Sequence, residues 1–379
     1  MKSKVNVKLV ILVVVLTLFG MLMIYSASSY SANVNYGDGF YFVKKQAFGL
    51  LMGLGIMIGA FFFDYHKYQK LRWYILGAGL IMLILVFIPG ISISNYGARR
   101  WIGFGGFSIQ SSEIAKFSFV IFAASYMSKN YQKMKTFKGF VPVVLAGGLT
   151  CLLILLEPNL SVTLCVGMVM LSMLAIGGIN MKWFIAILIP ALLLVPILII
   201  IEPYRLQRLV AFINPWENPV DEGYQLIQSL YSLGAGGFFG VGLFNSRQKY
   251  LFLPFSESDF IFSIIGEEFG FFGCLLVCLV YVLIIAQGMK IALRAKDRFG
   301  SYLAFGITAV IAFQVLINIA VVTGSIPPTG IPLPFVSAGG TSLMVFLGAI
   351  GILLNIDKQS KSEFVPIKIK QLKYKKSKV

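Results

Sequence analysis

The sequence predicts an all-α, polytopic membrane protein of about ten transmembrane helices, with a large extracytoplasmic loop between the seventh and the eighth. Three observations predict this class. First, 58% of the 379 residues are hydrophobic and only 12% are charged, whereas water-soluble proteins have about 25% charged residues. Second, apolar runs of about 20 residues, the length that crosses a bilayer, recur along the chain. Third, Lys and Arg gather in alternate connections between these runs, a pattern that the positive-inside rule explains.

The apolar runs give the boundaries of the expected helices. We expect spans near 9–27, 46–63, 73–90, 112–127, 140–156, 160–177, 183–201, 260–289, 302–323 and 339–356. The fifth and sixth are separated only by Glu157-Pro158-Asn159, which predicts a tight turn. The first run is too long for the apolar part of a signal peptide, so we expect it to stay in the protein. Residues 1–356 are therefore one transmembrane domain, which contains the large loop 202–259, and residues 357–379 are a basic tail.

The distribution of positive charge sets the orientation. The net charge is +17, and with ten spans 23 of the 32 Lys and Arg fall in the connections and termini on one side. This side is the cytoplasmic one by the positive-inside rule, so both termini are expected in the cytoplasm. The basic tail then serves as an anchor on an anionic leaflet, and no nucleic-acid partner is expected.

The connections on the other side are long and carry more than linkers need. Residues 89–112, 202–259 and 324–338 are rich in Gly, Pro and aromatics, and long loops of this kind in ordered proteins are usually functional. Within them, residues 224–236 have apolar residues at helical spacing, which predicts a helix lying on the membrane surface.

Basic residues on this side oppose the positive-inside bias and therefore need a reason. A cluster of Arg and Lys at a membrane surface suits the binding of phosphate groups; the alternative is anchoring to lipid headgroups and surface ion pairs. The members in the long loops are Arg99, Arg100, Arg205, Arg208, Arg247 and Lys249.

Ionisable residues also lie inside the predicted spans. Glu113 and Lys116 are three residues apart on one helix face, and Glu267 and Glu268 lie about two turns into the eighth span. Charges in a bilayer are costly and face the interior of a bundle, where they pair. They are either structural salt bridges or the wall of a polar cavity. Asp259, at the mouth of the eighth span, is equally open: a carboxylate there can cap the helix or act as a general base.

Metal and triad chemistry have little support. The four cysteines lie in apolar runs without the further ligands of a metal set, and His66 is the single histidine. Neither a Ser-His-Asp triad nor a His-rich metal site is expected.

Several strings, in their order along the chain, resemble the SEDS family (shape, elongation, division and sporulation), and within it the FtsW and SpoVE branch rather than RodA. The resemblance covers roughly residues 9–356. The strings are Gly97-Ala98-Arg99-Arg100-Trp101-Ile102, Gln110-Ser111-Ser112-Glu113 with Lys116, Glu157-Pro158-Asn159-Leu160, Asn214-Pro215-Trp216, Gln228-Ser229, Gly236-Gly237, Ser246-Arg247-Gln248-Lys249, Leu253-Pro254, Asp259-Phe260-Ile261-Phe262, Gly266-Glu267-Glu268, Pro328-Thr329-Gly330, Pro332-Leu333-Pro334-Phe335 and Ser337-Ala338-Gly339-Gly340-Thr341-Ser342.

The chain departs from the family pattern in three places. The family's Gln-Pro-Ser-Glu is Gln110-Ser111-Ser112-Glu113, where a Ser is expected to cap the helix in place of the proline. Its Pro-Asp-Leu-Gly is Pro158-Asn159-Leu160-Ser161, which removes a carboxylate at position 159. Its Pro-Glu is Pro254-Phe255.

The resemblance implies a peptidoglycan glycosyltransferase of the bacterial plasma membrane, active at the extracytoplasmic face. It polymerises lipid II, an undecaprenyl-diphosphate-linked disaccharide-pentapeptide, with inversion, for division or sporulation. Asp259 matches the family's essential aspartate and is assigned as general base. The residues implied to bind substrate or to line its cavity are Arg100, Trp101, Glu113, Lys116, Arg208, Arg247, Lys249 and Ser337.

The same resemblance bears on cofactors and partners. A divalent cation (Mg or Mn) can assist the diphosphate, although no acidic cluster in the sequence demands one. A class B penicillin-binding protein is the expected partner, with other division or sporulation membrane proteins. Two alternatives remain open: a lipid II flippase, suited by the intramembrane charges and Gly-Pro segments, and a non-catalytic scaffold of the division machinery.

Overall fold

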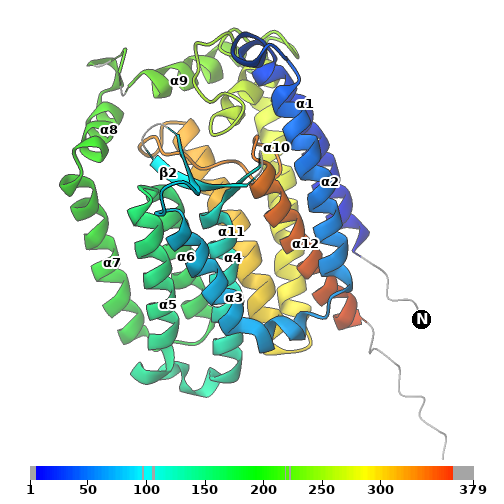
Figure 1. Ribbon diagram of the computed structural model, residues 1–379, viewed down its shortest axis with the longest axis vertical. Coiled ribbons are helices and arrows are strands. Elements are labelled where there is room, and N and C mark those ends of the chain that lie inside the picture. Colours follow the sequence, from blue (N-terminus) through cyan, green and yellow to red (C-terminus); the bar gives the residue numbers. More distant parts are fainter. Residues whose placement is uncertain (1–5, 96–97, 105–106, 218, 222, 362–379) are drawn as a thin grey trace, which may run out of the picture.

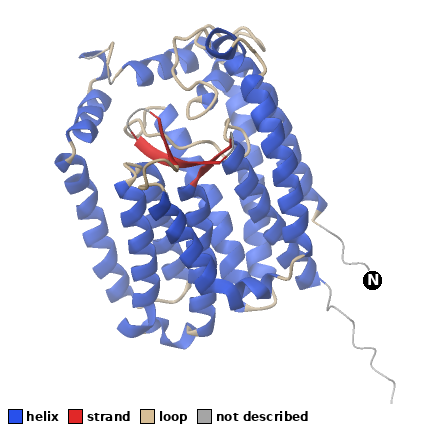
Figure 2. Cartoon of the chain, viewed as in Figure 1, coloured by secondary structure: helices blue, strands red, loops and turns tan. Residues whose placement is uncertain are grey.

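The computed structural model describes residues 6–361 except 96–97, 105–106, 218 and 222. Over these residues the chain forms a helical bundle with one small sheet (Figures 1 and 2). The α-helices are α1 Val7–Tyr36, α2 Tyr41–Phe62, α3 Tyr65–Leu85, α4 Ser111–Lys129, α5 Phe137–Leu156, α6 Leu160–Ile176, α7 Met181–Ile201, α8 Pro203–Ile213, α9 Tyr224–Gly236, α10 Ile261–Arg294, α11 Arg298–Val322 and α12 Gly340–Lys361. Two short 3₁₀ helices cover Tyr131–Lys135 and Pro215–Glu217.

The helices confirm the predicted class of a polytopic helical membrane protein. Each predicted span falls on one helix, namely α1 to α7 and α10 to α12. Of the described helices, seven are long and apolar enough to cross a membrane: α1, α2, α5, α7, α10, α11 and α12. Helices α3 and α4 carry more polar residues and α6 has 17 residues, yet all three lie beside the others in the bundle (Figure 1). The total of ten spans stays a prediction.

The connections near the helix ends follow local sequence chemistry. Glu157-Pro158-Asn159 is the predicted turn: α5 ends at Leu156, and the Asn159 side chain caps α6 by accepting a hydrogen bond from the Val162 amide at 3.3 Å. An aspartate would cap in the same way, so the change at position 159 keeps this function. The expected serine cap of α4 is wrong, because the cap position is Gln110 without a side-chain bond. The Ser111 hydroxyl donates to Glu157 Oε1 instead, at 2.8 Å.

The small sheet was not part of the predicted all-α fold. It has three antiparallel strands in the order β1 Ser92–Asn95, β2 Ala98–Phe104 and β3 Phe107–Gln110. The sheet lies across the mouth of the bundle, close to the start of α4 (Figure 2). We call this the sheet end of the bundle. The start of α1 and the end of α12 point toward the opposite end (Figure 1), and residues 362–379 of the predicted tail lie outside the described residues.

The helices differ in burial: the bundle has a packed centre and one peripheral helix. Helices α4, α11 and α12 bury most of their residues. By contrast, α7 buries no residue, and it stands at one side of the molecule (Figure 1). Space is therefore left between α7 and the bundle, which borders the cavity described below.

Helix α10 is broken at Gly270. Its backbone there has φ 68° and ψ −164°, a conformation that residues other than glycine rarely adopt. The groups around the break bond to the preceding loop: Phe271 N donates to Gly237 O at 2.8 Å and Val241 N donates to Glu267 O at 2.9 Å. Irregular backbone at membrane depth is tolerated where protein satisfies it. The single predicted span 260–289 is thus two helical pieces, and the predicted helix over 224–236 is α9.

Candidate functional site

A cavity of about 1630 Å³ opens at the sheet end, which is larger than the 300–1,000 Å³ typical of small-molecule pockets. Its polar part is lined by side chains from β2, α8 and the loop before α10: Arg100, Trp101, Arg205, Arg208, Glu257 and Asp259. Its apolar part lies between α7 and the bundle and is lined by Leu164, Met168, Val195, Ile199, Leu316 and Ile317. The cavity therefore has two connected parts. We call the polar part the charged chamber and the apolar part the apolar slot.

Asp259 lies in the charged chamber and does not cap α10. The residue at the cap position of α10 is Phe260, which makes no side-chain cap bond, so the helix-capping alternative is wrong. The Asp259 carboxylate accepts a hydrogen bond from Ser258 Oγ at 3.1 Å and lies against Gly330. Burial raises the pKa of Asp259, and the positive charges of Arg100 and Arg208 act in the opposite direction. A carboxylate with a raised pKa beside a cavity is suited to accept a proton.

Arg100 and Arg208 reach the chamber from two different elements. Arg100, on β2, donates to the carbonyls of Glu157 at 3.2 Å and Pro158 at 2.5 Å. Arg208, on α8, donates to Pro328 O at 3.2 Å and lies over the ring of Tyr204 at 4.5 Å. Burial lowers the pKa of Arg100, and the Asp259 carboxylate opposes this. The two predicted diphosphate residues are thus brought beside the predicted base.

Glu157, below Arg100, is a buried carboxyl at the turn between α5 and α6. Burial raises its pKa to about 8, although the Ser111 hydrogen bond and the charge of Arg100 lower it. Its backbone carbonyl accepts from Arg100 Nε, so the turn supports the guanidinium from underneath.

The predicted pair on α4 is present and fully enclosed. Lys116 Nζ contacts Glu113 Oε1 at 2.8 Å, with both side chains at most 1% exposed. Lys116 also donates to Gln314 Oε1, and Glu113 Oε2 accepts from Ser342 Oγ at 3.2 Å. Ser342 lines the cavity whereas the pair itself does not. The pair therefore supports the cavity floor from inside the bundle.

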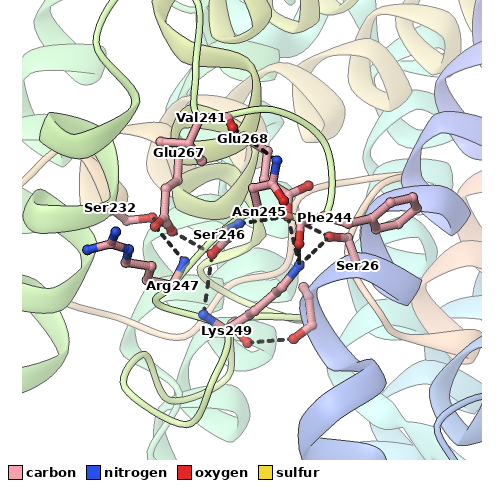
Figure 3. A network of polar contacts seen from close by, with 12 residues as sticks. Ser26, Ser232, Val241, Phe244, Asn245, Ser246, Arg247, Lys249, Glu267 and Glu268 are labelled. Carbon is pink, nitrogen blue, oxygen red and sulfur yellow. Dashed lines mark hydrogen bonds and ion pairs between the residues drawn. The ribbon is translucent and has the colours of Figure 1, made fainter.

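The contacts of Arg247 and Lys249 differ from those of Arg100 and Arg208. Lys249 Nζ contacts Glu268 Oε1 at 3.2 Å and donates to Phe244 O at 2.6 Å, and Lys249 is among the residues that line the cavity. Figure 3 shows the network around it, in which Glu267 and Glu268 bind the loop residues before Lys249. The guanidinium of Arg247 points away from this network (Figure 3), and Arg247 does not line the cavity. Their predicted diphosphate roles stay predictions, and the geometry favours Arg100 and Arg208.

Ser337 is likewise set back from the cavity. Its hydroxyl donates to Ser258 O at 2.7 Å and accepts from the Leu333 amide at 2.7 Å. It joins the segment before α12 to the residue preceding Asp259. Its contact with substrate stays a prediction, and the two hydrogen bonds of its hydroxyl are to backbone groups.

Sequence reasoning missed residues that the fold adds to the chamber. It is also lined by Glu257, Glu202 and Thr329, and burial raises the pKa of Glu257. Lys45, one of the nine Lys and Arg expected outside the cytoplasm, lines the cavity too. The position of Glu257, two residues before Asp259, was the available signal. Among the described residues no group of three or more His, Cys, Asp or Glu is placed to hold a metal ion. The divalent cation stays a prediction.

Comparisons with known proteins identify the family of the chain. The family model for FtsW, RodA and SpoVE, described as "Cell cycle protein", matches residues 7–362. The chain belongs to this family. The SEDS resemblance is therefore confirmed on the whole of the helical domain.

SEDS relatives of two kinds share about two fifths of their residues with the chain. A probable peptidoglycan glycosyltransferase FtsW of Geobacter sulfurreducens is 40% identical over 354 residues, 93% of this chain and 95% of the relative. Stage V sporulation protein E of Bacillus subtilis is 40% identical over 365 residues, 95% of this chain and 99% of the relative. These names agree with the predicted FtsW and SpoVE branch.

Solved structures show the same SEDS fold. A chain from a structure of a peptidoglycan synthase complex that coordinates polymerization and crosslinking has a TM-score of 0.79 at 25% identity, covering 95% of this chain and 99% of that one. The rod shape determining protein RodA of Thermus thermophilus has a TM-score of 0.68 at 22% identity, covering 95% and 98%.

Proposed function

We propose that this chain is a peptidoglycan glycosyltransferase that polymerises lipid II into glycan strands, with Asp259 as the general base. The observation that carries the proposal is the joining of Asp259, Arg100 and Arg208 in one chamber with an apolar slot below. Lipid-linked sugar donors have the same three parts: a sugar, a diphosphate and a hydrocarbon chain. The names of the FtsW and SpoVE relatives support the reaction class.

The reaction assigns one function to each part of the cavity. The 4-hydroxyl of an N-acetylglucosamine attacks the anomeric carbon of the N-acetylmuramic acid on a second lipid II. Asp259 takes the proton of this hydroxyl. The bond from the anomeric carbon to the diphosphate breaks with inversion, and undecaprenyl diphosphate leaves. Arg100 and Arg208 stabilise its developing negative charge.

Trp101 and the apolar slot also shape the binding of the substrate. Trp101 offers an aromatic wall to the glycan in the charged chamber. The slot between α7 and α6 takes the hydrocarbon chain, because its lining is apolar and α7 leaves it open along the bundle. The reaction then takes place at the extracytoplasmic face of the plasma membrane of a bacterium, with both termini of the chain in the cytoplasm.

The partner is a class B penicillin-binding protein, together with other division or sporulation membrane proteins. The similar solved structure is part of a peptidoglycan synthase complex, which supports such pairing. The two alternatives have less support. A flippase needs access from both faces, whereas beneath this cavity lie the Glu113–Lys116 pair and the packed centre of the bundle. A pure scaffold does not need a cavity in which a carboxylate lies beside two arginines.

The test is glycan polymerisation from lipid II by purified protein in detergent. Asp259→Asn is expected to abolish polymer while its melting temperature stays near that of the wild type. Asp38→Asn is the matched control, because Asp38 is a carboxylate of a neighbouring loop that pairs with Lys44 and does not line the cavity. Full polymer yield from folded Asp259→Asn would refute the general base, and lipid II translocation by a chain that makes no polymer would favour the flippase.

A further inference from the structure

The backbone around Asp259 is held at three consecutive carbonyls. Glu257 O accepts from the Ala338 amide at 2.9 Å, Ser258 O from Ser337 Oγ at 2.7 Å and Asp259 O from Asn318 Nδ2 at 2.8 Å. Two of these donors belong to the segment before α12, and the third is a side chain of α11. The position of the Asp259 backbone is therefore set by the rest of the cavity wall.

Asn318 joins two walls of the cavity with one amide group. Its Nδ2 donates to Asp259 O and also to Ile331 O, at 2.7 Å. The residue is 1% exposed and does not line the cavity. Its Oδ1 has no hydrogen-bond partner among the described residues. Burying an unpaired acceptor is unfavourable. The two hydrogen bonds that the Nδ2 group donates therefore explain why an amide stands at this position.

A second amide, one turn earlier on α11, holds the next residue of the same segment. Gln314 Nε2 donates to Pro332 O at 2.9 Å, and Gln314 Oε1 accepts from Lys116 Nζ. Residues four apart lie on one face of a helix, so Gln314 and Asn318 present their amides side by side. Because α11 is one of the most buried helices, it is a rigid support for the segment that contains Thr329 and Gly330.

We propose that Asn318 is a positioning residue for glycosyl transfer, which holds the carbonyls of Asp259 and Ile331 together so that the Asp259 carboxylate stays aligned with the cavity wall. The inference rests on the proposed function of Asp259 as the general base. Asn318 acts through the backbone and does not touch substrate. Its loss changes the rate of the chemical step and leaves substrate binding in place.

The experiment compares two buried asparagines in the purified full-length protein. Asn318→Leu keeps the size of the side chain and removes its donors. Asn355→Leu is the matched control: Asn355 is 3% exposed and its Nδ2 donates to Phe61 O at 2.7 Å, far from the cavity on α12. We expect both variants to melt at lower temperature. The kcat of lipid II polymerisation per folded protein falls at least about tenfold for Asn318→Leu alone, while its KM changes less than about twofold.

A smaller variant and the base variant complete the design. Asn318→Ser, which lacks the second donor, is expected to show the same loss of kcat. The inference is overturned by a wild-type kcat in the Asn318 variants, by a rise in KM without a fall in kcat, or by an equal fall in kcat for Asn355→Leu. It is also overturned if both Asn318 variants fail to fold while Asn355→Leu folds. Activity of Asp259→Asn in the same assay would overturn the proposed base; an inactive Asp259→Asn beside fully active Asn318 variants overturns only this inference.

Discussion

Gly330 gives the most direct test of how closely the Asp259 carboxylate is held. A Cβ placed on Gly330 would lie 2.7 Å from Asp259 Oδ2, whereas ordinary contacts of a Cβ begin near 3.4 Å. Gly330→Ala must therefore displace the carboxylate or the loop by about 0.7 Å. A displacement of about 1 Å at reacting groups costs about 100-fold in rate, so we expect kcat to fall about 10- to 100-fold, or about 1.4–2.7 kcal/mol in the activation free energy.

The assay is glycan polymerisation from lipid II, with the melting temperature measured on the same samples. Gly339→Ala is the control in the same loop, because its Cβ would meet only Ser342 Cβ at 3.6 Å, an ordinary contact. Gly339→Ala is expected to keep its kcat within about threefold of the wild type. A folded Gly330→Ala with unchanged kcat would show that the carboxylate need not stay where the structure places it, and the base assignment would lose its geometric support.

Two further predictions concern the basic residues. Arg208→Gln removes a positive charge that lowers the pKa of Asp259, so that pKa rises; because the base acts when deprotonated, the acid limb of the kcat/KM profile moves to higher pH. We also expect kcat/KM to fall about 10- to 100-fold from the lost charge-assisted hydrogen bonds; an unmoved limb would contradict the electrostatic link. Lys249→Met leaves Glu268 buried without its partner and is expected to cost about 3–5 kcal/mol of stability, seen as a lower melting temperature. Adding Glu268→Gln should restore most of this, and restored folding without restored polymerisation would favour the predicted diphosphate contact of Lys249.

The helical scaffold was predictable because its signals are local. Apolar runs locate the helices, since each span must satisfy the hydrogen bonds of its own backbone within the bilayer. The turn at Glu157-Pro158-Asn159 and the Glu113–Lys116 pair also follow from neighbours in the sequence. Helix α9 follows from apolar spacing over one short segment. Each of these features needs no knowledge of what packs against it.

Most of the missed features depend on contacts between distant segments, and the small sheet depends on the pairing of neighbouring short strands. The sheet over 92–110 forms from short strands whose register, such as Trp101 beside Gln110, no apolar period reveals. The break at Gly270 is compensated by the 237–242 loop, which is separated from it by the rest of the long loop before α10 and the first part of α10. Asn318 is a polar residue within a largely apolar span, and the sequence alone does not show what it contacts. Its two partners both lie outside α11, and one of them, Asp259, is also far away in the sequence.

The basic residues expected outside the cytoplasm divide by how fully the protein uses them. The Lys249 ammonium meets Glu268, Ser26 and the Phe244 carbonyl, which matches its three donors. A guanidinium has five donors, of which, among the described residues, Arg208 directs one to a protein oxygen. Arg208 also faces a cavity that it shares with the half-buried carboxylate of Asp259. Arg208 is half-buried, so its other donors are open to a ligand in the cavity. The cavity lining carries five cationic side chains and three carboxylates, those of Glu202, Glu257 and Asp259. The remaining donor capacity of Arg208 therefore argues that the chamber is built for a ligand with more negative charge than the protein itself provides, which a diphosphate satisfies and a neutral sugar does not.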